Sequence, residues 1–237
     1  MSDFPEGAVA LISGASRGIG DHVGAELLRQ GWTVSLGMRK PVMPAWAEGH
    51  EDRVQLVAYE AGDVTAEARW VSEALGRFGR IDALVANAGI MIPKTVIEAE
   101  DDDIDAMMSV NLKAPRRLAK AAWEALAATG RGRVIILASL SGKRVKSAGA
   151  GSYSLSKFAA VALAHAIRQA GFDQGIRATA VCPGFVATDM GTTLSGRAPE
   201  MMTQPDDLAR IIAMLLALPN SASVAEFAIN CQLEEFF

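Results

Sequence analysis

The chain has 237 residues, with 23 Lys and Arg against 27 Asp and Glu, a formal net charge of −4 and 50% hydrophobic residues. This composition excludes an intrinsically disordered chain, and the length suffices for a full hydrophobic core. The mildly acidic balance argues against a protein that binds nucleic-acid phosphates through a basic face. We therefore expect a globular protein that has no nucleic acid among its partners.

Cysteine usage and hydropathy indicate the compartment. Cys182 and Cys231 form neither a CxxC motif nor a disulfide framework, which is typical of buried thiols in a reducing compartment. The first residues show no basic segment followed by an apolar one, so no signal peptide is expected. The longest apolar stretch, 211–218, is far shorter than the ~20 residues that span a bilayer. The sequence therefore predicts a cytoplasmic protein with no membrane partner.

Short apolar runs alternate with segments of helical period along nearly the whole chain. Seven runs rich in Val, Ile and Leu are predicted as strands: Ala8–Ile12, Thr33–Leu36, Val54–Tyr59, Ala83–Ala86, Val134–Ala138, Arg177–Val181 and Ala225–Ile229. Five segments are predicted as helices: Gly18–Gln30, Thr65–Phe78, Asp102–Ala128, Ser152–Ala170 and Pro205–Leu218. This alternation predicts an α/β fold, a doubly wound and mostly parallel sheet with helices on both faces. With no repeat and no linker, 1–237 is expected to form a single domain.

One connection breaks this rhythm after the second predicted strand. Two prolines within Pro41-Val42-Met43-Pro44 remove backbone donors and restrict the residues that precede them. We expect a short irregular helix around Ala45–Glu48, which serves as a shortened surface connection.

The first predicted strand ends in a glycine-rich turn, Ser13-Gly14-Ala15-Ser16-Arg17-Gly18-Ile19-Gly20, which leads into a helix. Glycines allow a tight turn and a close approach to a ligand, and the helix N-terminus offers N–H groups to a phosphate. By itself such a turn is as compatible with a structural role as with a functional one. Its position favours a nucleotide-phosphate site, because ligands of open parallel sheets bind at the carboxyl ends of strands.

The end of the second predicted strand, Leu36-Gly37-Met38-Arg39-Lys40, lacks an acidic residue. Proteins that bind NAD usually place an acid here to hold the ribose 2′-hydroxyl. Arg39 can instead bind a 2′-phosphate, with Arg17 approaching from the other side, so we expect NADP(H) in preference to NAD(H). The alternative is a pair of solvated surface cations.

Tyr153 and Lys157 lie four residues apart in a predicted helix and therefore share one of its faces. A free Tyr titrates near pH ~10, and a neighbouring cation lowers that pKa toward the range of a useful acid–base group. An ordinary pair on a helix surface is the alternative.

The sequence shows no other convincing functional motif. His22, His50 and His165 show no spacing of metal ligands, so no metal is expected. No GxSxG motif supports a hydrolase.

Taken together, these features resemble the short-chain dehydrogenase/reductase family. The resemblance runs from about Ala8 to Thr188 and rests on SGASRGIG, Asp63-Val64, Ala86-Asn87-Ala88-Gly89, Asn111, Ser139, Tyr153-xxx-Lys157 and Pro183-Gly184, in that order. It implies a Rossmann-type fold and hydride transfer between NADP(H) and the carbonyl/alcohol pair of a small molecule.

The resemblance also implies individual roles. Residues expected to hold the cofactor are Gly14, Ser16, Arg17, Gly18, Ile19 and Gly20 at the pyrophosphate, Asp63 and Val64 at the adenine, Asn87, Ala88 and Gly89 beneath it, and Pro183, Gly184, Val186 and Thr188 beside the nicotinamide. Tyr153 is implied as the proton donor to the carbonyl oxygen, to which Ser139 hydrogen-bonds. Lys157 is implied to lower the pKa of Tyr153 and bind the nicotinamide ribose, and Asn111 to hold a water that relays protons to Lys157.

Several features depart from the family's pattern. Ala86 replaces the first Asn of the usual NNAG, and Ser139 precedes Tyr153 by 14 positions, one more than is commonest, which leaves Ser141 as a minor candidate for the serine role. The segment at about 189–204 is short, which predicts a small substrate lid. The C-terminal sequence lacks the TG…DGG ending of the ketoacyl-carrier-protein reductases, which argues against a role in fatty-acid synthesis.

The sequence also predicts an oligomeric state and leaves two alternative functions open. The Ala-rich helices 102–128 and 152–170 correspond to the dimer seam of the resembling family, which predicts a homo-oligomer, a tetramer or a dimer. The alternatives to an oxidoreductase are a catalytically silent NADP(H)-binding regulatory protein, against which Asn111, Ser139, Tyr153 and Lys157 speak, and a methyltransferase, which would need an acid in place of Met38.

Overall fold

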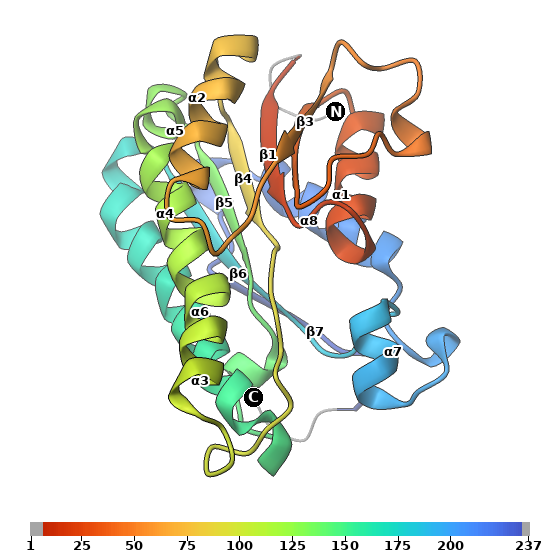
Figure 1. Ribbon diagram of the computed structural model, residues 1–237. Helices are drawn as coiled ribbons and strands as arrows, with labels where there is room; N and C mark the ends of the chain where they lie inside the picture. Colours follow the sequence, from red (N-terminus) through yellow and green to blue (C-terminus); the bar gives the residue numbers. More distant parts are fainter. Residues whose placement is uncertain (1–6, 234–237) are drawn as a thin grey trace.

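Seven parallel strands form one sheet in the computed structural model, which describes residues 7–233 (Figure 1). Their order is β3-β2-β1-β4-β5-β6-β7, with bounds β1 Val9–Ser13, β2 Thr33–Met38, β3 Val54–Ala58, β4 Ala83–Ala86, β5 Arg133–Leu137, β6 Arg177–Pro183 and β7 Glu226–Ile229. The strand order reverses between β1 and β4, where a doubly wound sheet opens a crevice for ligands. The predicted α/β fold is confirmed.

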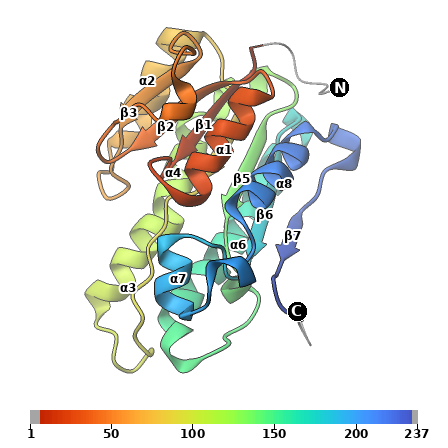
Figure 2. The same ribbon diagram turned by 90° about the vertical axis from the view of Figure 1, so that its right-hand side faces the viewer.

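Helices cover both faces of this sheet and bury a separate apolar core on each (Figures 1 and 2). One face carries α1 (Gly18–Arg29) and α8 (Pro205–Ala217). The other carries α2 (Ala66–Phe78), α4 (Ala114–Ala121), α5 (Trp123–Ala128) and α6 (Gly151–Gly171). Because both faces are covered, β1, β2, β4, β5 and β6 are buried along their whole length rather than at alternate positions. No helix in the described part of the chain is both long and apolar enough to traverse a bilayer.

The helix expected over 102–128 is interrupted in the structure. It consists of α3 (Asp101–Met108), a π-helical turn η2 (Ser109–Lys113), α4 and α5. Pro115 has no N–H to donate to the carbonyl of Asn111, the residue four positions earlier, and the helix widens there. Such π-turns are frequent at functional sites, and this one contains Asn111.

Short elements occupy the connections. The irregular helix expected near Ala45 is confirmed as η1, Ala45–Ala47. The segment after β6 contains the unpredicted helix α7, Asp189–Ser195, which lies beyond the carboxyl ends of the strands (Figure 1). The remaining short turns are η3 Leu140–Gly142, η4 Ala148–Ala150, η5 Phe172–Gln174, η6 Pro199–Met201 and η7 Asn220–Ala222.

Candidate active site

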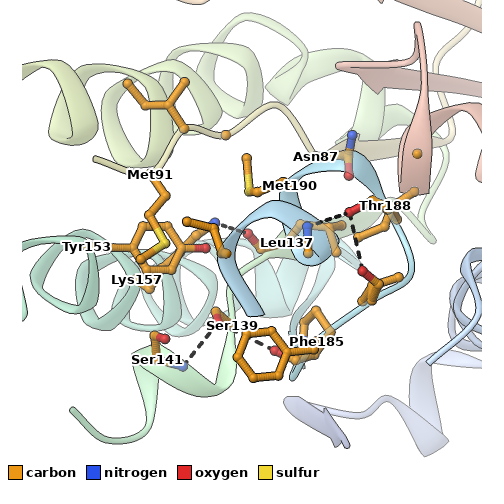
Figure 3. A pocket seen from close by; sticks show the side chains of 18 of the residues that line it. Asn87, Met91, Leu137, Ser139, Ser141, Tyr153, Lys157, Phe185, Thr188 and Met190 are labelled. Atoms are coloured by element: carbon orange, nitrogen blue, oxygen red, sulfur yellow. Dashed lines mark hydrogen bonds between the residues drawn. The ribbon is translucent and has the colours of Figure 1, made fainter. Parts of the chain in front are cut away.

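A cleft of about 1140 Å³ lies at the carboxyl ends of the strands (Figure 3). It gathers most of the residues that the sequence indicated, from five strand ends and from α6: Gly14, Ser16, Arg17, Gly18, Ile19, Arg39, Asn87, Ala88, Gly89, Ser139, Ser141, Tyr153, Lys157, Pro183, Gly184, Val186 and Thr188. Gly20 and Asn111 are buried behind this lining. Asp63 and Val64 are not among the lining residues.

The glycine-rich turn fits the phosphates of a dinucleotide. Gly14 adopts a φ of 67°, and a Cβ there would stand 2.9 Å from the Cα of Ala88. A Cβ at Gly20 would stand 2.4 Å from the carbonyl oxygen of Gly14. At the N-terminus of α1, Arg17 makes no side-chain capping bond, so the first N–H groups of this helix remain available to an anion.

The ends of β1 and β4 are tied together beneath this turn. The Ser13 hydroxyl accepts hydrogen bonds from the backbone N–H groups of Asn87 and Ala88, each at 3.0 Å. The Asn87 amide donates to the carbonyl oxygens of Ser13 and Gly14, also at 3.0 Å. Ala86 is buried within β4, so Asn87 fixes the cleft floor without the additional Asn of the family pattern.

At the end of β2, the side chain of Met38 is buried, whereas Arg39 is exposed and lines the cleft. Arg17 reaches across the cleft to Asp189 at the start of α7, with 2.7 Å between Nη1 and Oδ2. NAD-binding proteins usually carry an acidic residue at the end of this strand, and the cation at that place in this chain is Arg39. Arg17 connects the glycine turn to α7.

Tyr59, Glu60 and Ala61, which follow β3, line the cleft although the sequence analysis did not identify them. The rule that ligands bind at the carboxyl ends of parallel strands was the signal that could have found them. Asp63, two residues further on, accepts hydrogen bonds from the backbone N–H and hydroxyl of Thr65, which hold the pKa of its carboxyl below the usual value.

A buried ion pair holds this β3–α2 connection in place. The guanidinium of Arg117 donates to the carboxylate of Glu67 at 2.8 Å and to the carbonyl oxygen of Ala61 at 2.7 Å. The Tyr59 hydroxyl donates to the same carboxylate at 3.0 Å, and its pKa is raised by burial and by the charge of Glu67. Arg117 of α4 thus holds in place the side of the cleft that the β3–α2 connection forms.

Ser139, Tyr153 and Lys157 converge on the opposite wall (Figure 3). The Ser139 oxygen accepts a hydrogen bond from the N–H of Ser141 at 3.1 Å, which orients it at the start of η3. The Lys157 ammonium is 5.6 Å from the centre of the Tyr153 ring and donates to the carbonyl oxygen of Leu137 at 2.7 Å. The Tyr153 phenol interacts with the side chain of Ser139, which favours Ser139 over Ser141 for the serine role.

The expected lowering of the Tyr153 pKa by Lys157 is wrong for this arrangement. Burial raises the pKa of Tyr153 to about 12, opposed only by its hydrogen bond with Ser139. Burial also lowers the pKa of Lys157 to about 8, from an ordinary value of 10.5. Desolvation penalises the charged form of both groups, so the group that titrates nearer neutrality is the ammonium.

Asn111 stands directly behind this wall. Its amide oxygen accepts from the N–H of Ile90, and its amide nitrogen donates to the carbonyl oxygen of Ile90 and to the hydroxyl of Ser156, all at 2.9 Å. Both amide hydrogens are therefore engaged, which leaves one lone pair of the oxygen for a water. A Cβ at Gly89 would stand 3.2 Å from Asn111 Oδ1 and 3.6 Å from Lys157 Nζ, so these groups are neighbours.

Comparison with known proteins agrees with this fold and arrangement. The family model for the short chain dehydrogenase matches residues 8–198, and the chain belongs to that family. It is 34% identical to the agropine synthesis reductase of Rhizobium rhizogenes over 98% of its own length, but it spans only about half, 54%, of that reductase.

Two solved structures share the fold over nearly the whole chain. An alcohol dehydrogenase from the archaeon Thermococcus sibiricus, complexed with 5-hydroxy-NADP, has a TM-score of 0.85 and 28% identity over 98% of this chain and 100% of that one. A 3-ketoacyl-(acyl-carrier-protein) reductase from Brucella melitensis, complexed with NADH, has a TM-score of 0.83 and 26% identity over 94% and 97%. Both of these structures hold a nicotinamide dinucleotide, and this chain belongs to the short chain dehydrogenase family.

Proposed function

We propose that the protein interconverts a carbonyl compound and an alcohol with NADP(H) as the preferred cofactor and Tyr153 as the proton donor and acceptor. The observation that carries this proposal is the convergence of Ser139, Tyr153 and Lys157 in the cleft that also contains the glycine-rich turn. NADPH absorbance followed against a panel of ketones, aldehydes and diketones tests it. A panel without any protein-dependent turnover would favour the silent, cofactor-binding alternative.

The chain's own residues define the chemistry around the substrate. Bound nicotinamide would supply or accept the hydride. The Tyr153 hydroxyl gives its proton to the carbonyl oxygen during reduction and takes it back during oxidation, and Ser139 donates a hydrogen bond to that oxygen. Lys157, 5.6 Å from the centre of the Tyr153 ring, and its neighbour Asn111 would exchange the proton of Tyr153 with solvent.

Cofactor preference is tested at Arg39. Replacement of Arg39 by Ala is expected to reduce the preference for NADPH over NADH, because it removes a charge-assisted contact to the 2′-phosphate worth about 1.5–3 kcal/mol. Lys40→Ala is the matched control, since Lys40 is an adjacent exposed cation that is not among the cleft-lining residues. Titration with both nucleotides measures the effect. Equal affinities in the wild type, or an unchanged preference in Arg39→Ala, would contradict the assignment.

Assembly is the second property to test. α6 presents apolar side chains to solvent, with Leu155 50% and Phe158 44% exposed, and small side chains at Ala159 and Ala162 allow another helix to approach closely. Light scattering at micromolar concentration is expected to give the molar mass of a tetramer, four times the 25.0 kDa of one chain. Phe158→Glu should lower this mass, whereas Val42→Glu, on an exposed loop, should not. A monomeric wild type would refute the prediction.

A further inference from the structure

The substrate side of the cleft combines apolar walls with a cationic rim. Met91 follows β4, Phe185 follows β6 and Met190 belongs to α7, and Figure 3 shows all three around Ser139 and Tyr153. Lys146, between η3 and η4, and Arg197, after α7, also line the cleft from two different segments. Arg144 lines the same wall as Lys146.

Lys146 and Arg197 meet at a single neutral amide, that of Gln232 after β7. The Lys146 ammonium stands 3.5 Å from one end of this amide. With its oxygen turned toward Arg197, the other end accepts from the two terminal guanidinium nitrogens at 3.1 and 2.5 Å. In that orientation the amide N–H₂ faces the ammonium, so Gln232 provides an acceptor for only one of the two cations.

No carboxylate balances these two charges within the described lining of the cleft. Its acidic members are Glu60, which follows β3, and Asp189, which pairs with Arg17. Two cations close together beside apolar walls create a local positive potential, although the chain as a whole carries a net charge of −4. A bound anion would relieve their mutual repulsion and supply acceptors for both.

We propose, on the basis of the carbonyl-reducing function above, that Lys146 and Arg197 bind a carboxylate of the substrate, so that the enzyme acts on oxo acids and the matching hydroxy acids. The planar guanidinium of Arg197 presents a fork that suits two carboxylate oxygens, and Lys146 adds a point charge from the other wall. The apolar side chains of Met91, Phe185 and Met190, which line the same cleft, accommodate the carbon chain that connects the carboxylate to the reacting carbonyl.

The experiment compares oxo acids of increasing chain length with their methyl esters, using NADPH and the wild-type protein. For the preferred length, kcat/KM is expected to be about tenfold or more higher for the acid than for the ester. Arg197→Gln and Lys146→Gln should each raise KM for the acid by on the order of tenfold and leave ester reduction unchanged. Arg29→Gln, which removes an exposed cation at the end of α1, is the matched control and should retain the preference.

The possible outcomes separate this inference from the proposed function. Esters reduced as efficiently as acids, or an acid preference that survives both substitutions, would overturn the carboxylate site while carbonyl reduction itself stands. Loss of the preference in Arg29→Gln as well would attribute it to overall charge and would also overturn the site. A wild type that reduces no carbonyl compound would overturn the proposed function, and the carboxylate site with it.

Discussion

Tyr153→Phe is expected to lower the turnover of carbonyl reduction by about 10²–10⁴-fold and to leave the affinity for NADPH nearly unchanged. The substitution removes only the hydroxyl and keeps the aromatic ring, so the shape of the cleft is preserved. Burial raises the pKa of this phenol to about 12, which keeps it protonated across the neutral range and suited to donate a proton during reduction. The phosphates are expected to bind at the glycine-rich turn, which does not involve the hydroxyl.

The measurement uses the best substrate found in the carbonyl panel, with NADPH affinity determined separately by titration. Retained nucleotide affinity serves as the control for folding, because the turn and Tyr153 belong to the same cleft. Wild-type turnover in Tyr153→Phe would mean that another group donates the proton, and the assignment of the site would have to be withdrawn.

The fold was predictable because local signals and tertiary constraints agree. β4, β5 and β6 are buried along their whole length and mostly apolar, as the two covered faces of a parallel sheet require, and strand–helix alternation leaves little freedom of topology. The interruption at Asn111 was not predicted, because the helical pattern of apolar residues continues through it. Pro115 was visible in the sequence, and its missing N–H was the available signal for a break one turn earlier.

The catalytic wall was predictable for a different reason. Tyr153 and Lys157 lie one helical turn apart, so their proximity follows from the helix alone, and Ser139 follows β5 at the start of η3. Contacts between distant segments were not predictable in this way. The pair of Arg17 with Asp189 joins residues 172 positions apart. Glu67, in the first turn of α2, is buried against Arg117, 50 positions away.

Lys157→Met is expected to abolish the pH dependence of alcohol oxidation near neutrality and to reduce turnover strongly. In the wild type, the buried Tyr153–Lys157 pair should lose its first proton at an apparent pKa near 8, because burial lowers the pKa of Lys157 to about 8. Above that pH, the neutral amine can accept the proton that Tyr153 passes on, so the oxidation rate rises through this value. Lys40→Met, at an exposed cation not among the cleft-lining residues, should leave the profile intact.

Stability measurements separate this loss of activity from unfolding. Between pH ~8 and the ordinary value of 10.5, the unfolded chain retains a proton on Lys157 that the folded chain has released. The free energy of unfolding therefore rises with pH across this window, by up to about 3 kcal/mol from this group. Lys157→Met should lose that rise, remain folded at pH 7 in urea titrations, and still show the strongly reduced turnover. A profile that keeps its rise near pH 8 in the variant would assign the titration to another group.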